Sequence, residues 1–371
     1  MSSVFPRTDR SLLGTWWWTV DRVLLAGLVL LLLVGVVIVF AASPPVGMLR
    51  FKDPYYFILR HLVFAIPAAL LILGCSLLAP LGVLRLAKGV FALGVVLMVL
   101  ALLFGPEING AHRWLRVGGV QLQPSEFVKP ALVVLVAAIA ASRPWPAATA
   151  TSLALAAIVI GLLLLQPDLG MAAIVLATLG LQLFVAGLPW LVVALVAGIG
   201  IGGALLAYEL FPHVSSRVDA YFAPPAEFTQ IERALRAVAS GGLFGRGPGE
   251  GIVKYNLPDA HTDFVFAATA EEFGILACLL IAALVAAILL RGLWRAHEAA
   301  DRFCQIAAVG LAAQFGLQAL VNMAVNLNLV PTKGMTLPFI SYGGSSMLAL
   351  GIATGWLLAL TRARARLEPG R

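Results

Sequence analysis

Ten long apolar runs constrain this chain more than any other feature of its sequence. A helix needs about 20 mainly apolar residues to cross the hydrocarbon core of a bilayer, because it rises only about 1.5 Å per residue. The runs cover residues 23–42, 57–79, 83–104, 125–142, 148–165, 170–187, 189–208, 264–290, 303–325 and 344–361. The first run is longer than the apolar segment of about 7–15 residues in a signal peptide, so we interpret it as a span. The sequence therefore predicts an all-α polytopic membrane protein with about ten transmembrane helices.

The composition agrees with this interpretation. Hydrophobic residues make up 61% of the chain and charged residues 12%, whereas soluble domains average about 45–50% and about 25%. These values exclude a soluble globular enzyme and a disordered scaffold. The three cysteines, Cys75, Cys278 and Cys304, lie within apolar runs and have neither a disulfide pattern nor metal-ligand spacing. We expect them to be small buried side chains.

The charge pattern predicts how the chain lies in the membrane. The net charge is +7, which in a soluble protein would indicate a nucleic-acid partner. Here the basic residues lie mostly at the ends of apolar runs, so we expect no nucleic-acid partner. Ten spans place both termini on one side, and the positive-inside rule makes that side cytoplasmic. We predict a single membrane domain, 1–371, with cytoplasmic tails at 1–22 and 362–371.

The long loop at 209–262, between the seventh and eighth spans, would then be extracytoplasmic. Residues 228–239 of this loop have helical spacing and could lie along the membrane surface. Loops of this length tend to be functional. The loop and its flanking residues therefore belong to the candidate functional region.

Four polar clusters lie within or beside the predicted spans, all on the predicted external face. They cover residues 109–129, 166–170, 257–272 and 331–346. Ionisable residues are costly in a bilayer, so these residues are functional candidates by default. Two prolines and three glycines prevent the last cluster from forming a continuous helix. Irregular backbone at membrane depth is tolerated only against protein or a cavity, so we expect this segment to line a cavity.

The first two clusters contain a possible ion pair and a possible helix cap. Pro124 and Ser125 are typical of a helix start. Glu126 and Lys129 are three residues apart, so they share a helix face and can pair. They could form a structural ion pair, and they could also bind a phosphate or position a base. Asp168 favours an N-cap over a chemical role.

The third cluster contains the strongest candidate for proton transfer. Asp263 would lie at a helix N-terminus, where the helix dipole favours its carboxylate and the apolar surroundings oppose it. Such a carboxylate can act as a general base or as an N-cap. Glu271 and Glu272 would lie about 12 Å further along the helix, where at least one should bond within the bundle. Asp259, His261 and Asp263 could also offer metal ligands, although their spacing is not diagnostic.

The motifs of these clusters resemble the SEDS family of bacterial membrane proteins (shape, elongation, division and sporulation), the FtsW and RodA group. The matching stretches are residues 123–126 with Lys129, 166–170, 241–245, 257–267, 271–272 and 331–346. The ten spans match this family too. Residues 331–334 are more similar to the division branch than to the elongation branch. Asp259 departs from the family, because many members carry Glu there.

The resemblance implies a peptidoglycan glycosyltransferase that polymerises lipid II outside the cytoplasmic (inner) membrane, for septal wall synthesis in cell division. It implies that Asp263 matches the family's essential aspartate. This residue would act as general base on the acceptor GlcNAc 4-hydroxyl, while undecaprenyl pyrophosphate leaves and the anomeric carbon inverts. The implied partners are lipid II, undecaprenyl lipids, an FtsI-like class B penicillin-binding transpeptidase and the divisome.

Positive charge for the leaving diphosphate would come from basic residues or from a divalent cation, Mg²⁺ or Mn²⁺, whose ligands the sequence does not identify. The basic candidates are Arg113, Lys129, Lys333 and Arg246. The predicted substrate-binding residues are Glu126, Lys129, Arg113, Trp114, His261, Thr262, Lys333, Ser341 and Tyr342. The predicted supporting residues are Asp168, Asp259, Glu271, Glu272 and Ser125. The alternative functions are a lipid II flippase or transporter, an elongation-branch polymerase and a non-catalytic scaffold.

Overall fold

Ten helices occupy the ten predicted spans, which confirms the fold class. The computed structural model describes residues 11–108, 110–210, 215, 219, 230–257, 259–331 and 334–363. The spanning helices are α2 (Arg22–Ala42), α4 (Tyr56–Ser76), α5 (Pro80–Phe104), α6 (Pro124–Ser142), α7 (Trp145–Leu165), α8 (Leu169–Val185), α9 (Trp190–Leu210), α12 (Val265–His297), α13 (Arg302–Asn326) and α14 (Gly344–Leu360). Seven of them are long and apolar enough to cross a membrane, while α8 and α14 are shorter apolar helices.

Shorter elements cluster around the ends of this bundle. They are α1 (Leu12–Thr19), α3 (Pro44–Phe51), α11 (Gln230–Gly241), the 3-10 helix η1 (Val253–Asn256) and the antiparallel strands β1 (Leu115–Val117) and β2 (Val120–Leu122). Gly118 and Gly119 join the two strands with φ angles of 58° and 80°, as a tight two-residue hairpin turn requires. The helical pattern at 228–239 corresponds to α11, whereas α1, α3 and the hairpin were not predicted from the sequence.

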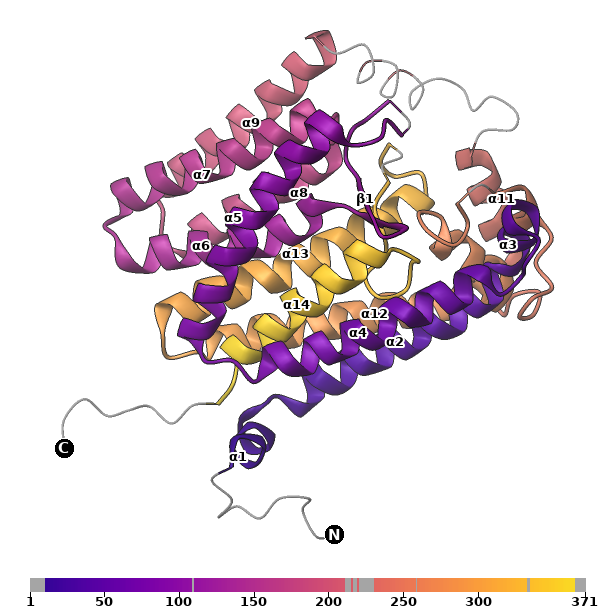
Figure 1. The fold of residues 1–371 in the computed structure, drawn as a ribbon, viewed down its shortest axis with the longest axis horizontal. Coiled ribbons are helices and arrows are strands. Elements are labelled where there is room, and N and C mark those ends of the chain that lie inside the picture. The colour runs from indigo at the N-terminus through magenta and orange to yellow at the C-terminus, as the bar shows by residue number, and fades with distance from the viewer. Residues whose placement is uncertain are drawn as a thin grey trace.

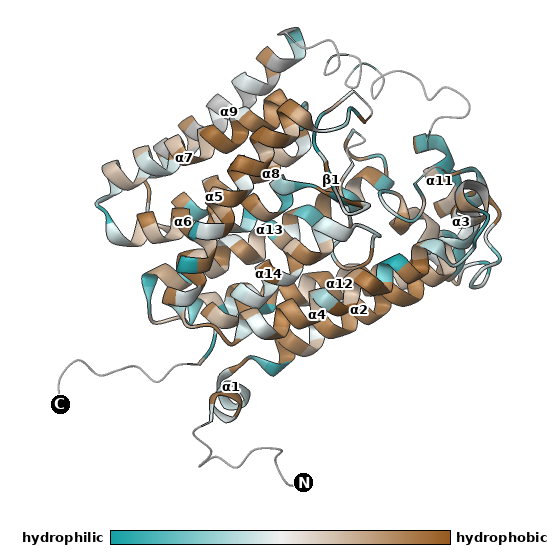
Figure 2. Ribbon diagram, viewed as in Figure 1, coloured by the Kyte–Doolittle hydropathy of each residue, from teal (hydrophilic) through white to brown (hydrophobic). Residues whose placement is uncertain are grey.

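Helices α6 and α13 form the centre of the bundle. In their most apolar stretches, 67% of α6 and 78% of α13 are buried inside the protein, against 22% of α5. Helix α13 packs against α6, α8, α12 and α14, and Figure 1 shows it surrounded by them. The outer helices expose leucines such as Leu59, Leu93 and Leu279. In a chain that spans a membrane, these exposed side chains contact lipid, and Figure 2 shows apolar residues along the helices.

The two ends of the described chain lie together at one end of the bundle. The Ala363 N–H donates to the Thr19 carbonyl at 2.9 Å, and Arg362 Nε donates to Thr19 Oγ1 at 2.9 Å. Nearby, Asp21 pairs with Arg291 at 2.7 Å and with Arg295 at 3.1 Å. The connections α5–α6 and α7–α8, together with α11 and the described residues 334–343, lie at the opposite end. The structure therefore places the four predicted polar clusters at one end of the bundle, as the sequence indicated.

Helix α12 breaks at Gly274, where φ is 81°. The break frees two N–H groups, and the segment before α12 bonds them. Ile275 N–H donates to the Gly242 carbonyl at 3.0 Å, and Leu276 N–H donates to the Leu243 carbonyl at 3.2 Å. A Cβ at Gly274 would lie only 2.3 Å from the Leu243 carbonyl oxygen. A glycine is therefore required at this position for the segment to pack on α12.

Gly35 offers a test of the contact between α2 and the segment before α14. A Cβ added at Gly35 would lie 2.0 Å from the Phe339 carbonyl oxygen. Gly35→Ala should therefore lower the unfolding free energy by about 1–3 kcal/mol, the usual cost of overpacking, and lower the melting temperature of the purified protein. Gly74→Ala in α4 is the control, because no atom lies within 4 Å of its added Cβ. Equal melting temperatures for the two variants would contradict this packing.

Candidate functional site

Four buried amide side chains form a stripe along one face of α13. They are Gln314, Gln318, Asn322 and Asn326, spaced four residues apart. Residues at this spacing share a helix face, and buried amides need hydrogen-bond partners. None of these four amides was predicted from the sequence as a site residue. The signal that could have found them is four amides at helical spacing within an apolar span, where polar residues are costly.

Two of these amides fix the backbone at Asp263. The Asp263 carbonyl accepts a hydrogen bond from Asn322 Nδ2 at 3.1 Å and another from Asn326 Nδ2 at 2.8 Å. Asn326 Oδ1 accepts from the Ala267 N–H at 3.0 Å, and Asn322 also donates to the Met335 carbonyl at 2.6 Å. Helix α13 therefore sets the positions of Asp263, of the first turn of α12 and of the segment that precedes α14.

The Asp263 carboxyl group is half-buried at the start of α12. It is not the N-cap, because Phe264 occupies that position and α12 has no side-chain cap. Burial, with a smaller contribution from the nearby Asp259 carboxylate, raises the pKa of Asp263 to about 7. The backbone at Gly334 approaches closely, since a Cβ there would lie 3.4 Å from Asp263 Oδ2. A carboxyl group with a pKa near neutrality is well suited to proton transfer.

The residues just before Asp263 pack against the segment that leads into α14. The Tyr342 N–H donates to the His261 carbonyl at 2.8 Å, and Ser341 Oγ donates to the Thr262 carbonyl at 2.6 Å. The His261 ring lies 3.9 Å from the Phe57 ring of α4, centroid to centroid. Four predicted substrate-binding residues therefore lie in one group beside Asp263, and the hydrogen bonds between them hold the backbone in place.

A buried ion pair forms the centre of a second group. Lys129 Nζ lies 2.9 Å from Glu126 Oε2, and both side chains are almost fully buried on α6. The ammonium also donates to Met171 Sδ at 3.1 Å and to Gln318 Oε1 at 3.3 Å. A lysine has three N–H donors, so these three acceptors match its capacity. The predicted pairing is confirmed, and α6 begins at Pro124 with Ser125 buried in its first turn.

Arg113 and Asp168 lie next to this ion pair. Asp168 caps α8 by accepting from the Met171 N–H at 3.4 Å, which confirms the predicted cap. Arg113 lies 3.7 Å from the Asp168 carboxylate and donates to the Gln166 carbonyl at 2.8 Å. Burial raises the pKa of Asp168, while Arg113 opposes that rise. The half-buried Trp114 has its ring 5.9 Å from the Arg113 guanidinium.

The segment that precedes α14 joins the two groups. Gln318, which binds Lys129, also donates to the Thr336 carbonyl at 3.1 Å and to Ser346 Oγ at 3.4 Å. Ser345 Oγ accepts from the Gln123 N–H at 3.0 Å. The residues around Lys129 and those around Asp263 therefore both contact residues 334–346, the segment predicted to line a cavity.

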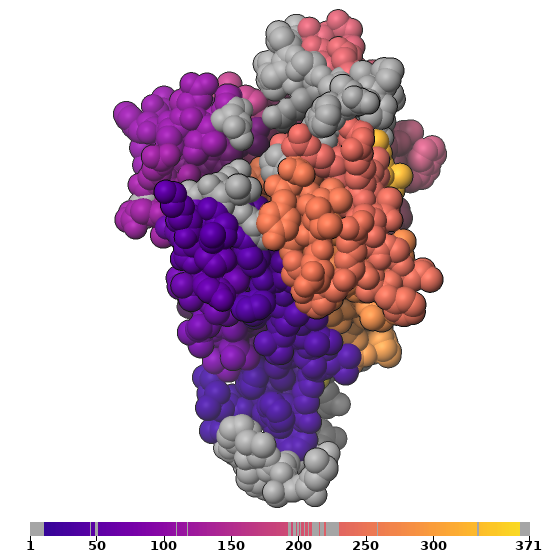
Figure 3. All heavy atoms as spheres, turned by 90° about the vertical axis from the view of Figure 1, so that its right-hand side faces the viewer, coloured from indigo at the N-terminus to yellow at the C-terminus, as the bar shows by residue number. Residues whose placement is uncertain are grey.

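Glu271 and Glu272 have a different role, because they hold the loop before α12 in place. Glu271 accepts from the backbone N–H groups of residues 252, 253 and 254 at 2.6, 2.7 and 2.9 Å. Glu272 pairs with the buried Lys254 and accepts from the Gly249 N–H at 3.0 Å. Lys254 also donates to the Ala41 carbonyl of α2 at 3.0 Å, and Figure 3 shows this loop beside the N-terminal helices. The sequence had indicated Glu271 and Glu272 but not their partner Lys254.

The other two predicted basic residues are Arg246 and Lys333. Arg246 is exposed, and its N–H donates to the Glu271 carbonyl at 2.9 Å, so it belongs to the loop before α12. Lys333 lies outside the described residues. Within the described part of the chain, no three His, Cys, Asp or Glu residues cluster closely enough to hold a metal ion.

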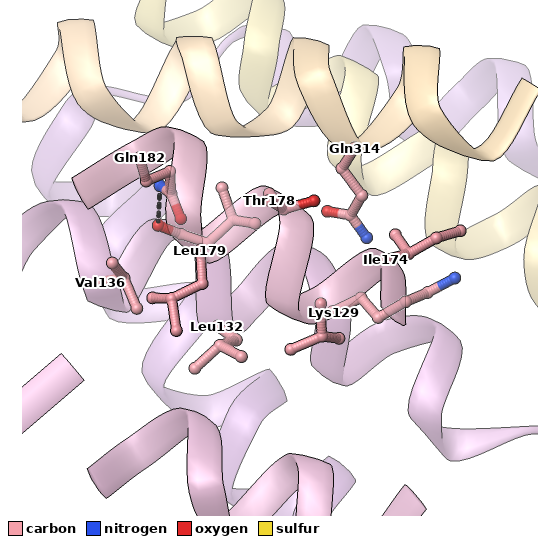
Figure 4. A pocket seen from close by; sticks show the side chains of 10 residues that line it. Lys129, Leu132, Val136, Ile174, Thr178, Leu179, Gln182 and Gln314 are labelled. Atoms are coloured by element: carbon pink, nitrogen blue, oxygen red, sulfur yellow. Dashed lines mark hydrogen bonds between the residues drawn. The ribbon is translucent and has the colours of Figure 1, made fainter. Parts of the chain in front are cut away.

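A small cavity of about 10 Å³, roughly the size that holds one water molecule, lies beside Lys129 between α6, α8 and α13. Figure 4 shows Thr178 and Gln314 directed toward each other across it. Thr178 Oγ1 and Gln314 Oε1 are buried, and neither has a hydrogen-bond partner among the described residues. Gln182 at the far side donates to the Val133 carbonyl at 2.9 Å. The cavity is therefore mainly apolar, with a few polar groups beneath the Glu126–Lys129 pair.

These features define a polytopic membrane protein with its polar site at one end of a helical bundle. The model of the cell cycle protein family FTSW_RODA_SPOVE matches residues 21–366, so the chain belongs to this family. A relative from Caulobacter vibrioides, named probable peptidoglycan glycosyltransferase FtsW, is 44% identical, with 97% of this chain and 94% of the relative covered. A relative of the same name from Hydrogenovibrio crunogenus is 36% identical, with 92% and 91% covered.

Solved structures show the same fold. One, described as "Structural coordination of polymerization and crosslinking by a peptidoglycan synthase complex", is 30% identical with a TM-score of 0.78 and covers 93% of this chain and 98% of its own. An aspartate-to-alanine mutant of the rod shape determining protein RodA from Thermus thermophilus is 29% identical with a TM-score of 0.71, covering 94% and 100%. The resemblance inferred from the motifs is confirmed.

The Glu126–Lys129 pair allows a double-mutant test. Lys129→Met leaves the buried Glu126 carboxylate without its cation, so it should lower the unfolding free energy by about 3–5 kcal/mol. Glu126→Gln combined with Lys129→Met removes both charges and should recover most of that loss. Chemical denaturation of the three purified proteins measures this difference. A double variant that is less stable than Lys129→Met would contradict the charge-pairing interpretation.

Proposed function

We propose that this protein is a peptidoglycan glycosyltransferase that polymerises lipid II for septal wall synthesis in cell division. The observation that carries the proposal is the half-buried Asp263 carboxyl group, whose pKa of about 7 suits it to accept a proton. The names of the relatives support the glycosyltransferase activity and the division branch. The same names favour this function over an elongation-branch polymerase, a lipid II transporter and a non-catalytic scaffold.

In the proposed reaction, Asp263 removes the proton from the 4-hydroxyl of the acceptor GlcNAc. The oxygen forms a bond to C1 of the lipid-linked MurNAc of the donor, and the bond from C1 to the diphosphate oxygen breaks. The electron pair of that bond leaves with undecaprenyl pyrophosphate, and the configuration at C1 inverts. The Asp263 carboxyl group can accept this proton only in its deprotonated form. Asp263 must therefore have lost its own proton before the step begins.

The proposed substrate-binding residues form two groups, one around Lys129 and one beside Asp263, and both contact residues 334–346. The first group is Arg113, Trp114, Glu126 and Lys129, and the second is His261, Thr262, Ser341 and Tyr342, with Lys333 as a further candidate. Arg113 contacts the Asp168 carboxylate, and Lys129 contacts the Glu126 carboxylate. We therefore propose that each ion pair binds the donor diphosphate as a unit. The proposed supporting residues are Ser125, Asp168, Asp259, Glu271 and Glu272.

We propose that the site lies on the outer face of the cytoplasmic membrane, with both termini in the cytoplasm. The charge distribution supports this orientation, because Arg291, Arg295 and Arg362 lie at the end that holds the chain termini. In this orientation the chain forms a single membrane domain, and the loop 209–262 lies outside the cytoplasm. Lipid II could then reach Asp263 with its polyprenyl tail still in the bilayer.

We further propose that a class B penicillin-binding transpeptidase and divisome proteins are the partners. The structure described as a peptidoglycan synthase complex supports a partner that crosslinks the glycan. Co-purification with the transpeptidase from the same genome tests this proposal. Polymerisation that is equal with and without that transpeptidase would argue against a role for the partner in activity.

Removing the proposed base should abolish polymerisation without unfolding the protein. Asp263→Asn keeps the shape of the side chain and loses the base, so the rate of glycan formation from lipid II should fall by about 10²–10⁴-fold. Glu250→Gln, which removes an exposed carboxylate from the loop before α12, is the control and should keep the wild-type rate. Chains formed by Asp263→Asn at the wild-type rate would exclude the general-base role and favour the scaffold or transporter.

The pH dependence of the rate offers an independent test. Only the deprotonated carboxylate accepts a proton, so the rate should rise with pH through about 7 and then level off. Asp259→Asn removes the neighbouring negative charge that raises the pKa of Asp263, so the midpoint should move to lower pH. Initial rates of lipid II polymerisation over a pH series measure both midpoints. Coinciding midpoints would contradict this electrostatic coupling.

A further inference from the structure

A second cavity lies at the end of the bundle that holds the chain termini, opposite Asp263. Its volume is about 330 Å³. Three connections meet there: the turn between α6 and α7, the turn between α8 and α9, and the start of α13. The lining residues that matter here are Arg143, Trp145, Ala148, Leu183, Leu188 and Arg302. None of these residues belongs to the proposed catalytic site.

Two guanidinium groups from distant parts of the sequence line this cavity. Arg143 Nη1 donates to Thr151 Oγ1 at 2.9 Å, and Arg302 Nη2 donates to the Ala186 carbonyl at 2.6 Å. A guanidinium has five N–H donors, so each arginine keeps donors for a ligand. Among the described residues, the ion pairs found involve neither arginine. The adjacent Asp301 caps α13 by accepting from the Phe303 N–H at 2.9 Å.

The cavity combines these charges with an apolar wall at the level of the membrane surface. Ala148, Leu183 and Leu188 are buried in its lining. Trp145 at the start of α7 and Trp190 at the start of α9 are 55% and 73% exposed. Exposed tryptophans at the ends of spans are typical of the head-group region of a bilayer. A ligand that fits this cavity is therefore negatively charged at one end and apolar at the other.

We propose that this cavity binds the phosphate of an anionic phospholipid head group. A phosphodiester can accept paired hydrogen bonds from a guanidinium fork, which is the strongest form of this contact. Basic pockets between spanning helices are known to bind acidic lipid head groups. The acyl chains would lie along the exposed apolar surfaces of the neighbouring helices. A free phosphate ion has the same charge chemistry, so the experiment must separate the two sources.

Lipid binding to the full-length protein tests the proposal. Native mass spectrometry of the purified protein, titrated with phosphatidylglycerol, should show at least one bound lipid, and phosphatidylcholine should bind at least about tenfold more weakly. Arg143→Gln with Arg302→Gln should reduce phosphatidylglycerol binding at least about tenfold, since about 1.4 kcal/mol corresponds to a factor of ten. Arg85→Gln with Lys88→Gln is the matched control, because it removes two exposed charges from α5 outside the cavity.

The possible results separate the site from general surface charge. An equal loss in the two double variants, or no loss in either, would overturn the proposal. Ala148→Phe narrows the cavity without changing charge and should also weaken binding, provided that its melting temperature stays at the wild-type value. Inorganic phosphate that displaces the lipid at equal molar concentration would assign the site to a free anion and overturn the lipid source. Retained lipid under these conditions supports it.

Discussion

The hydrogen-bonding requirement of three buried amides on α13, Gln318, Asn322 and Asn326, determines how the functional end of this protein is built. An unsatisfied buried polar group costs about 1–3 kcal/mol, and these three amides avoid that cost by bonding within the bundle. Asn322 and Asn326 bond to the carbonyl of Asp263, and Gln318 bonds to Lys129 and Thr336. Helix α13 is also the most buried of the spans assessed by length and apolarity. The proposed base is therefore positioned by a helix at the centre of the bundle.

The other polar contacts at this end fix irregular backbone that a bilayer would not tolerate alone. Residues 334–343 are not helical, yet their backbone groups bond to Gln318, Asn322 and residues 261–262. The loop before α12 is held in the same way by Glu271, Glu272 and Lys254. Among the described residues, the side chains of Glu271 and Glu272 bond to this loop and not to the group around Asp263, so their charges have a structural role. Asp263 thus keeps its half-buried carboxyl group available for chemistry.

The two ends of the bundle differ in charge and in construction. At the end with Asp263, carboxylates and cations pair with each other or with backbone groups inside the protein. At the other end, arginines lie near the surface, and Asp21 alone contacts both Arg291 and Arg295. This asymmetry supports the proposed orientation. It also explains why the cavity at Arg143 and Arg302 suits an anion, whereas the cavity beneath Lys129 is mainly apolar.

The sequence by itself determined the ten spans, because about 20 apolar residues have few other stable arrangements than a membrane helix. It also determined the Glu126–Lys129 pair and the Asp168 cap, since both depend on residues only three positions apart along a helix. The contacts between distant segments could not be predicted in this way. Three features join separate parts of the chain. They are the pairing of Lys254 with Glu272, the bonds from Asn322 and Asn326 to Asp263, and the cavity that Arg143 and Arg302 share. Only the packing of the helices brings them together, because spacing along a sequence sets the faces of single helices and not which faces meet.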